Sequence, residues 1–298
     1  RHGSDLPLPR EEELSCRIAL LPDCHVSGKA LEASNPPGRP MRRLYPFAAR
    51  LLEEQVHALN EADTPGFDAI FLLGDTLDPA DQRSLAWLQN LIAASRVPVY
   101  PIIGNHEGYG GISDEDFHLA LGLPVHGNYV VRVQGLPFLM LATPGQGSLA
   151  PGSEGYRWLA STLGEMQDED AVFCCAHFSL LLHPCVQGAR NDGMQVLWSA
   201  DSLLDLLASH PNVRAWIAGH KNIPSKVIDQ GILHLLSPQL IQAPCGFREL
   251  QVSPRSIESL VHPLADEELA LLSREAYGAG YPERHGHPED RDFSWTWS

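Results

Sequence analysis

Five short polar clusters, each directly after an apolar run of β-strand type, constrain this chain more than any other feature. In order they are Asp23-Cys24-His25, Gly74-Asp75-Thr76-Leu77-Asp78, Gly104-Asn105-His106-Glu107, His177 and Gly219-His220-Lys221-Asn222. The carboxyl ends of parallel strands meet at one edge of a sheet, where α/β proteins bind ligands. Carboxylates, imidazoles and an amide gathered there are the donors of a two-metal hydrolytic centre. The pattern therefore predicts a metal site built from strand ends.

Apolar periodicity predicts alternating strands and helices in the first half of the chain. Strands are expected over 17–21, 67–73 and 97–103, with helices over 47–60 and 79–95. This order implies a parallel sheet with right-handed crossovers. In the second half we expect strands over 129–133, 137–142, 171–176, 213–218, 225–229, 232–237, 247–252 and 257–261, and helices over 114–121, 154–165, 192–210 and 265–276. We expect one domain over 16–276, a loose arm or tag remnant over 1–15, and a polar tail over 277–298.

Composition narrows the class of protein further. The formal net charge of −16 across 298 residues disfavours binding of long nucleic acids, whereas a small phosphorylated substrate is compatible with bound cations that reverse the local field. Six cysteines without a C-x-x-C pair favour buried, reduced thiols over a disulfide framework. No apolar run reaches the ~20 residues of a membrane span. We expect a cytoplasmic protein, with a removed leader as the alternative; oligomeric state is left open.

Each candidate ligand has a plain structural alternative when taken alone. Asp23 and His25 leave their strand on the same side, and Asp75 can bridge two cations with its two oxygens. Asn105 can offer its side-chain oxygen to a metal, although a Gly-Asn turn is an equal reading of that pair. A single histidine at the end of an apolar strand is more often a packed structural residue than a metal ligand, and this alternative applies to His177 and to His220. The joint occurrence of all five clusters in this order favours the metal site.

These motifs resemble the calcineurin-like metallophosphoesterase superfamily over about residues 16–262, with a cyclic-nucleotide or glycerophosphodiesterase-like branch as one option. The resemblance implies a four-layer αββα sandwich of two mixed sheets. It implies two divalent metals, manganese or iron first, with zinc, cobalt and magnesium as alternatives. One metal would be held by Asp23, His25, Asp75 and position 222, the other by Asp75, Asn105, His177 and His220. A metal-bridging hydroxide would attack phosphorus, and His106, paired with Asp78, would assist the leaving group.

The chain departs from that pattern at Asn222, where the second histidine of G-H-x-H is expected. An amide oxygen is a harder and weaker donor than imidazole and favours manganese or magnesium over zinc. The first metal site is then weak, or empty, or the residue is an introduced substitution. His234, on a neighbouring strand, is a candidate replacement, although its apolar context favours a packed histidine. We expect a two-metal site with weakened affinity at the first metal.

The expected activity is hydrolysis of a small phosphodiester, or of a phosphomonoester. The rival hypothesis is a catalytically weakened member of the fold that serves as a binding or scaffold protein, and a third is a metal-dependent enzyme for a non-phosphate ester. Two loops carry basic side chains that are candidate substrate contacts, with solvated surface arginines as the alternative. These candidates are Arg39, Arg42, Arg43 and Arg190.

Overall fold

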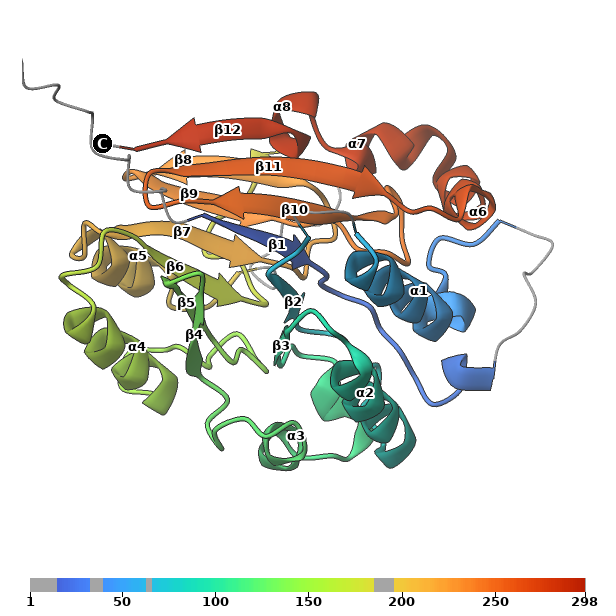
Figure 1. The fold of residues 1–298 in the computed structure, drawn as a ribbon, viewed down its shortest axis with the longest axis horizontal. Helices are drawn as coiled ribbons and strands as arrows, with labels where there is room; N and C mark the ends of the chain where they lie inside the picture. The colour runs from blue at the N-terminus through green and yellow to red at the C-terminus, as the bar shows by residue number, and fades with distance from the viewer. Residues whose placement is uncertain (1–14, 33–39, 63–65, 185–195, 298) are drawn as a thin grey trace, which may run out of the picture.

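Two six-stranded mixed sheets form the centre of the molecule in a computed structural model that describes residues 15–32, 40–62, 66–184 and 196–297 (Figure 1). The first sheet has the order β12-β11-β10-β1-β2-β3 and the second β4-β5-β6-β7-β9-β8. β1, β2 and β3 are parallel, as are β5, β6, β7 and β9, while β10 runs antiparallel to β1. The predicted mixed α/β architecture is therefore confirmed.

The first sheet contains β1 (Cys16–Leu20), β2 (Ala69–Leu73), β3 (Val99–Ile102), β10 (Gly246–Val252), β11 (Ser256–Pro263) and β12 (Phe293–Thr296). The second contains β4 (Tyr129–Val133), β5 (Leu136–Met140), β6 (Val172–Ala176), β7 (Val213–Ala218), β8 (Ser225–Asp229) and β9 (Ile232–Leu236). The helices are α1 (Ala48–Asn60), α2 (Gln82–Ala94), α3 (Asp114–Ala120), α4 (Glu154–Glu165), α5 (Ala200–Ala208), α6 (Glu267–Tyr277), α7 (Tyr281–His285) and α8 (Pro288–Arg291).

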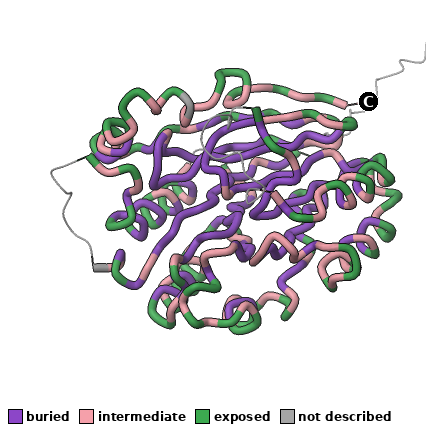
Figure 2. Tube along the Cα trace, turned by 180° about the vertical axis from the view of Figure 1, so that it is seen from behind, coloured by how far each residue is buried: buried purple, intermediate pink, exposed green. Residues whose placement is uncertain are grey.

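Three apolar cores separate four layers. The middle core lies between the sheets, where Phe71 of β2 packs against Phe138 of β5 with ring centroids 5.2 Å apart. A second core joins the first sheet to α1, α2 and α6, and a third joins the second sheet to α4 and α5. Adjacent Cys174 and Cys175 contribute to the third and the middle core respectively, because successive strand side chains point to opposite faces. Figure 2 shows the buried strands enclosed by helices whose outer surfaces are exposed.

Most predicted strands lie within a residue or two of those observed, and the hairpin turn at Gln134-Gly135 has positive φ at both residues. Only part of the long helix expected over 192–210 falls in described residues, and there it is the shorter α5.

All described cysteines are buried and free, whereas Cys185 lies outside the described residues. Each described helix is too short or too polar to cross a lipid bilayer.

The segment expected to be a polar tail carries regular structure. After α7 and α8, β12 pairs antiparallel with β11, and Phe293, Trp295 and Trp297 pack against the core between the sheets. Sequence patterning missed this strand because it is only four residues long. Its packing depends on aromatic side chains that look isolated in the sequence.

Candidate metal centre

The five polar clusters converge at the carboxyl ends of β1, β2, β3, β6 and β7, as the strand-end pattern predicts. Parallel strands of the two sheets deliver these loops to one place, with the apolar core between the sheets behind them. Two groups of metal-compatible donors result, each with its ligand atoms within 4.8 Å of one another. One group is His25, Asp75 and His106, and the other is Asp75, His177 and His220. Asp75 belongs to both, which is the arrangement required of a bridging carboxylate.

Asp75 is the hub of the site and is 1% exposed. Its Oδ2 lies 3.1 Å from His177 Nε2, and its Oδ1 accepts a hydrogen bond of 2.9 Å from the backbone N–H of His106. Although burial opposes ionisation, His177 lowers the pKa of Asp75 well below its usual range. The carboxylate is therefore ionised at neutral pH and available to cations.

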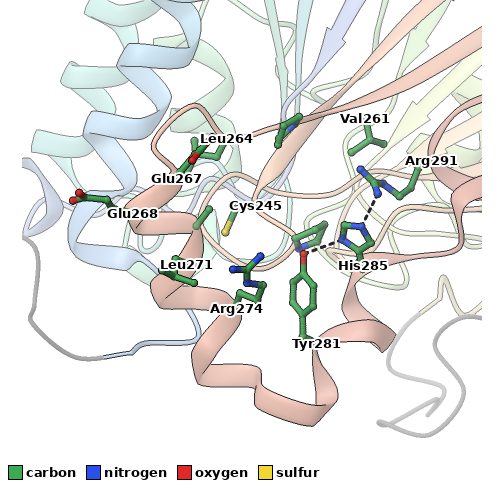
Figure 3. A pocket seen from close by; sticks show the side chains of 13 residues that line it. Cys245, Val261, Leu264, Glu267, Glu268, Leu271, Arg274, Tyr281, His285 and Arg291 are labelled. Atoms are coloured by element: carbon green, nitrogen blue, oxygen red, sulfur yellow. Dashed lines mark hydrogen bonds between the residues drawn. The ribbon is translucent and has the colours of Figure 1, made fainter.

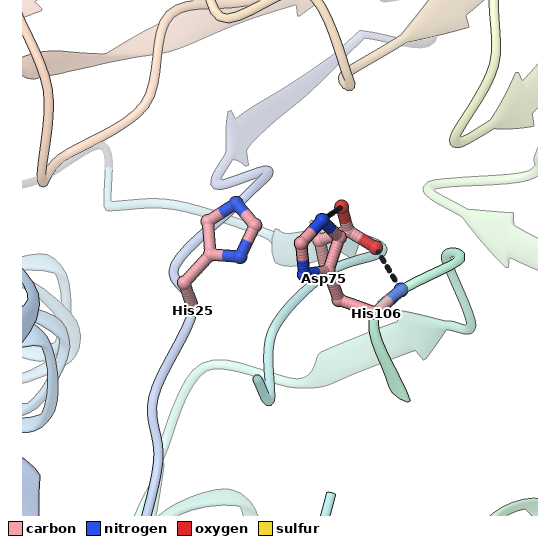
Figure 4. A group of neighbouring side chains, drawn as sticks. All are labelled: His25, Asp75 and His106. Atoms are coloured by element: carbon pink, nitrogen blue, oxygen red, sulfur yellow. Dashed lines mark hydrogen bonds and ion pairs between the residues drawn. The ribbon is translucent and has the colours of Figure 1, made fainter. Parts of the chain in front are cut away.

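His25 and His106 turn their rings toward the same space from the loops after β1 and β3, with Asp75 beside them (Figure 4). Their ring centroids are 4.7 Å apart, and Asp78 Oδ2 approaches Nδ1 of His25 at 3.0 Å and Nδ1 of His106 at 2.9 Å. Burial alone would lower the pKa of His25, but the carboxylates of Asp23 and Asp78 raise it to about 10. The Asp78 carboxylate therefore contacts both His25, a predicted metal ligand, and His106, the predicted proton donor.

His177 and His220 close the second donor group. His177 is fully buried, and its Nδ1 donates to the carbonyl of Leu73 at 2.8 Å, which leaves Nε2 free to face Asp75. That nitrogen lies 3.2 Å from Nδ1 of His220. Asp75 outweighs burial and raises the pKa of His177 to about 9, whereas burial and His177 lower that of His220 to about 4.

Asp23 and the two asparagines complete the set that the sequence predicts. Asp23 accepts a 2.7 Å hydrogen bond from the backbone N–H of His220, which ties the first sheet to the second. The side-chain oxygens of Asn105 and Asn222 are buried and have no hydrogen-bond partner among the described residues. A buried, unpartnered amide oxygen is costly unless a cation or water satisfies it. The donors present therefore fit divalent metals.

Strained backbone accompanies these side chains. Non-glycine residues with positive φ cluster at the site, at Asp23 (53°), His25 (49°), Asp75 (52°), His220 (62°) and Asn222 (60°). Left-handed backbone is unfavourable for residues with a Cβ and is found where function requires it. A Cβ on Gly104 would lie 2.3 Å from Asp75 Oδ1, so this glycine permits the close approach of the loop after β3 to that carboxylate.

Glu107 has a role that the sequence reasoning did not assign. Its buried carboxylate accepts backbone hydrogen bonds from Asp75, Thr76, Leu77 and Gly104, at 2.6 to 3.1 Å. Burial and Asp75 raise the pKa of Glu107 to about 7, although the four donors favour the ionised form. The residue thereby fixes the loop that carries Asp75. Its place directly after Asn105-His106 was the available signal, but nothing in the sequence shows that it points inward.

Two exposed tyrosines beside the histidines were also missed. The Tyr45 ring lies edge-on to His25 at 5.8 Å, and the Tyr109 ring lies 4.9 Å from His106 while its hydroxyl accepts a 3.2 Å hydrogen bond from Asn105. Arg43 donates to the Tyr45 hydroxyl and, at 2.9 Å, to Gln242. A solvent-accessible aromatic rim therefore borders the donor groups.

The four candidate arginines have different outcomes. Arg43 contacts Tyr45 next to His25, whereas Arg42 lies over the ring of Tyr277 at 5.3 Å and is directed to the end of α6. Arg39 and Arg190 lie outside the described residues.

His234 has two buried ring nitrogens without hydrogen-bond partners among the described residues. Ile232 and Leu236, on the same face of β9, belong to the core against α4 and α5. This position does not support His234 as the metal ligand that would replace the histidine absent at position 222.

Fold and donor set together define a metal-dependent phosphoesterase class of α/β protein. The sequence model of the calcineurin-like phosphoesterase family matches residues 16–224, so the chain belongs to that family. Membership supports a metal-dependent phosphoric ester hydrolase and implies a dinuclear centre of divalent metals. A search of curated protein sequences finds no match.

Solved structures with the same fold include a dimetal phosphatase from Danio rerio, with a TM-score of 0.65 and 18% identity, covering 85% of this chain and 98% of that one. Purple acid phosphatase PPD1 from yellow lupin (Lupinus luteus) seeds has a TM-score of 0.54 and 16% identity, covering 86% of this chain and 52% of that one. GAP50, the anchor in the inner membrane complex of Plasmodium, has a TM-score of 0.55 and 14% identity, covering 94% of this chain and 100% of that one.

Proposed function

We propose that this protein hydrolyses a small phosphodiester at a two-metal centre. The observation that carries the proposal is the shared carboxylate of Asp75, which belongs to two donor groups at adjacent strand ends. We assign Asp23, His25, Asp75 and Asn222 to the first metal, and Asp75, Asn105, His177 and His220 to the second. When bound, two divalent cations would activate a water molecule and neutralise charge on the transferred phosphoryl group. Manganese and iron are the first candidates because the donors mix oxygen with imidazole nitrogen.

His106 is the proposed proton donor to the leaving group. The Asp78 carboxylate lies 2.9 Å from its Nδ1 and orients the ring. The opposite nitrogen, Nε2, is 3.8 Å from Oδ2 of Asp75, the residue that both donor groups share. A proton donor at this position would serve an alkoxide leaving group, and on this ground a diester is our first choice of substrate. Arg43, held by Tyr45 beside His25, is the proposed contact to a substrate oxygen.

Hydrolysis assays with two chromogenic substrates test the proposal. Metal-free protein would be loaded in turn with Mn²⁺, Fe²⁺, Co²⁺, Zn²⁺ and Mg²⁺ and assayed on bis-p-nitrophenyl phosphate and p-nitrophenyl phosphate. We expect metal-dependent turnover, faster on the diester, that is lost in Asp75→Ala. Asp168→Ala changes an exposed carboxylate on the surface and serves as the matched control. Faster turnover of the monoester would reject the diester preference alone.

A weakened member of the fold that acts as a binding protein is the second candidate. Asn222 motivates it, because the residue places a weaker donor where the family pattern has imidazole. One fold neighbour, GAP50, is described as an anchor. This candidate requires that none of the five metals supports turnover of either substrate while the protein remains folded. Metal-dependent turnover that Asp75→Ala abolishes would eliminate it.

A further inference from the structure

A hollow of about 400 Å³ lies between α6, α7 and the ends of β10 and β11, in the part of the chain beyond the family match. Figure 3 shows it with Cys245 on its floor and Arg274 and Tyr281 directed toward its interior. Its apolar wall includes Cys245, Val261 and Leu264, all buried. A concave apolar surface of this volume with a few converging polar groups is typical of small-molecule sites.

The polar wall is a hydrogen-bonded row whose donor directions follow from its chemistry. The Arg291 guanidinium, which can only donate, contacts Nε2 of His285, so Nε2 carries the lone pair. The neutral imidazole then has its hydrogen on Nδ1, which lies 3.0 Å from the Tyr281 hydroxyl oxygen and donates to it. Burial and the adjacent Arg291 lower the pKa of His285, in agreement with the neutral form. The Tyr281 hydroxyl hydrogen is left to point elsewhere.

Arg274 supplies the positive charge. Its guanidinium lies over the Tyr281 ring, 5.9 Å from the centroid, and no carboxylate within the described residues forms an ion pair with it. The Tyr281 hydroxyl likewise has His285 as its one hydrogen-bond partner within that same part of the chain. A cation and a directed O–H donor thus border the same apolar hollow without an acceptor from the described protein.

We propose that this hollow binds a small monocarboxylate with an apolar body. One carboxylate oxygen accepts from Arg274 and the other from Tyr281, while the hydrocarbon packs against Cys245, Val261 and Leu264. Exposed Glu267 and Glu268 on the rim disfavour ligands with more than one negative charge. The site uses residues outside both donor groups of the metal centre, so it stands apart from the phosphoesterase proposal.

Titration calorimetry of the full chain with octanoate tests this site. We expect saturable binding of octanoate, and binding at least about tenfold weaker for octanamide, since a charge-assisted hydrogen bond contributes at least about 1.4 kcal/mol. Equal affinity for octanoate and octanamide would show that the carboxylate is not recognised and would overturn the proposal. So would the absence of saturable binding up to about 5 mM octanoate, which corresponds to negligible affinity.

Variants locate the bound anion. Arg274→Gln, at an exposed position, is expected to weaken octanoate binding about tenfold or more, and Tyr281→Phe to weaken it about threefold to tenfold. Arg255→Gln, which changes an exposed arginine elsewhere on the surface, should leave the affinity unchanged. Asp75→Ala should bind octanoate as the unmodified chain does. Loss of binding in Asp75→Ala with retention in Arg274→Gln would place the anion at the metal centre and overturn the proposal.

Discussion

The Asp78 carboxylate oxygen that lies 2.9 Å from Nδ1 of His106 is the same atom that approaches Nδ1 of His25 at 3.0 Å. The two histidines lower the pKa of Asp78 far below its usual range, against the effect of burial. One acid therefore orients both a proposed metal ligand and the proposed proton donor. Loss of its charge should affect both protonation of the leaving group and retention of the first metal.

Asp78→Asn should reduce kcat by about 10- to 100-fold on a diester with an alkyl leaving group, because the proposed proton donor His106 loses the carboxylate that orients its ring. The loss on bis-p-nitrophenyl phosphate should be smaller, since nitrophenolate leaves without a proton. Steady-state assays at saturating metal measure both effects. Equal losses on the two substrates would argue against a role for Asp78 in leaving-group protonation.

Gly104→Ala should disable the centre through a single methyl group. The added Cβ would lie 2.3 Å from Asp75 Oδ1 and 2.6 Å from the Asp75 backbone nitrogen, so the bridging carboxylate must move. We expect loss of bound metal and a decrease in stability of about 1–3 kcal/mol, measured by metal analysis and urea unfolding.

The matched control is Gly164→Ala in α4, where a Cβ meets nothing within 4 Å. Helix propensity predicts that this change increases stability by about 0.5–1 kcal/mol and leaves metal content unchanged. Similar metal loss in both variants would contradict the role assigned to Gly104.

The affinity of the first site for its metal should depend on the residue at position 222. We expect it to be highest with histidine, lower with asparagine and lowest with alanine. Asn222→His supplies the stronger imidazole donor and should increase the affinity for Zn²⁺ about tenfold or more. Asn222→Ala removes an oxygen that is buried without a partner among the described residues, and should weaken that site. Competition with a chelating dye, together with metal content per chain, measures both. Unchanged affinity in Asn222→Ala would show that this side chain is not a ligand.

Metal uptake at pH 7 should release about two protons per chain. The raised pKa values of His25, about 10, and His177, about 9, mean that both rings are protonated in the metal-free protein, whereas ligation requires them neutral. Calorimetry in buffers of different ionisation enthalpy counts these protons, with Asp75→Ala as the control. Metal binding without proton release would contradict the assignment of these ligands.

The same shifts set the pH dependence of stability in the metal-free protein. Because the folded-state pKa of each histidine lies above its unfolded value of about 6.5, the stabilisation is fully present below that pH. It is lost as pH rises through about 9 to 10. Urea unfolding of the metal-free protein at pH 7 and pH 10 should show this loss.

Sequence reasoning could place the candidate residues at one edge of the structure because each follows an apolar run and therefore lies at a strand end. Asp75 and His177 could be placed at the same edge by sheet topology alone. The inward orientation of Glu107 could not be predicted, because it depends on four backbone donors from two loops that meet only after folding. The strand β12 was missed for a related reason. Trp295 packs against the core between the sheets, and this contact cannot be inferred from the local sequence pattern.

The segment after α6 also contacts the loop that carries Asn222. Arg284 of α7 donates a 3.0 Å hydrogen bond to the carbonyl of Asn222, and a Cβ on Gly286 would lie 2.4 Å from the carbonyl of Pro224. The loop with Asn222, the proposed atypical metal donor, is therefore braced by residues some 60 positions later in the chain. Trimming the protein at the end of the family match would remove that brace. Homologues aligned only up to residue 224 would give a misleading picture of how tightly position 222 is held.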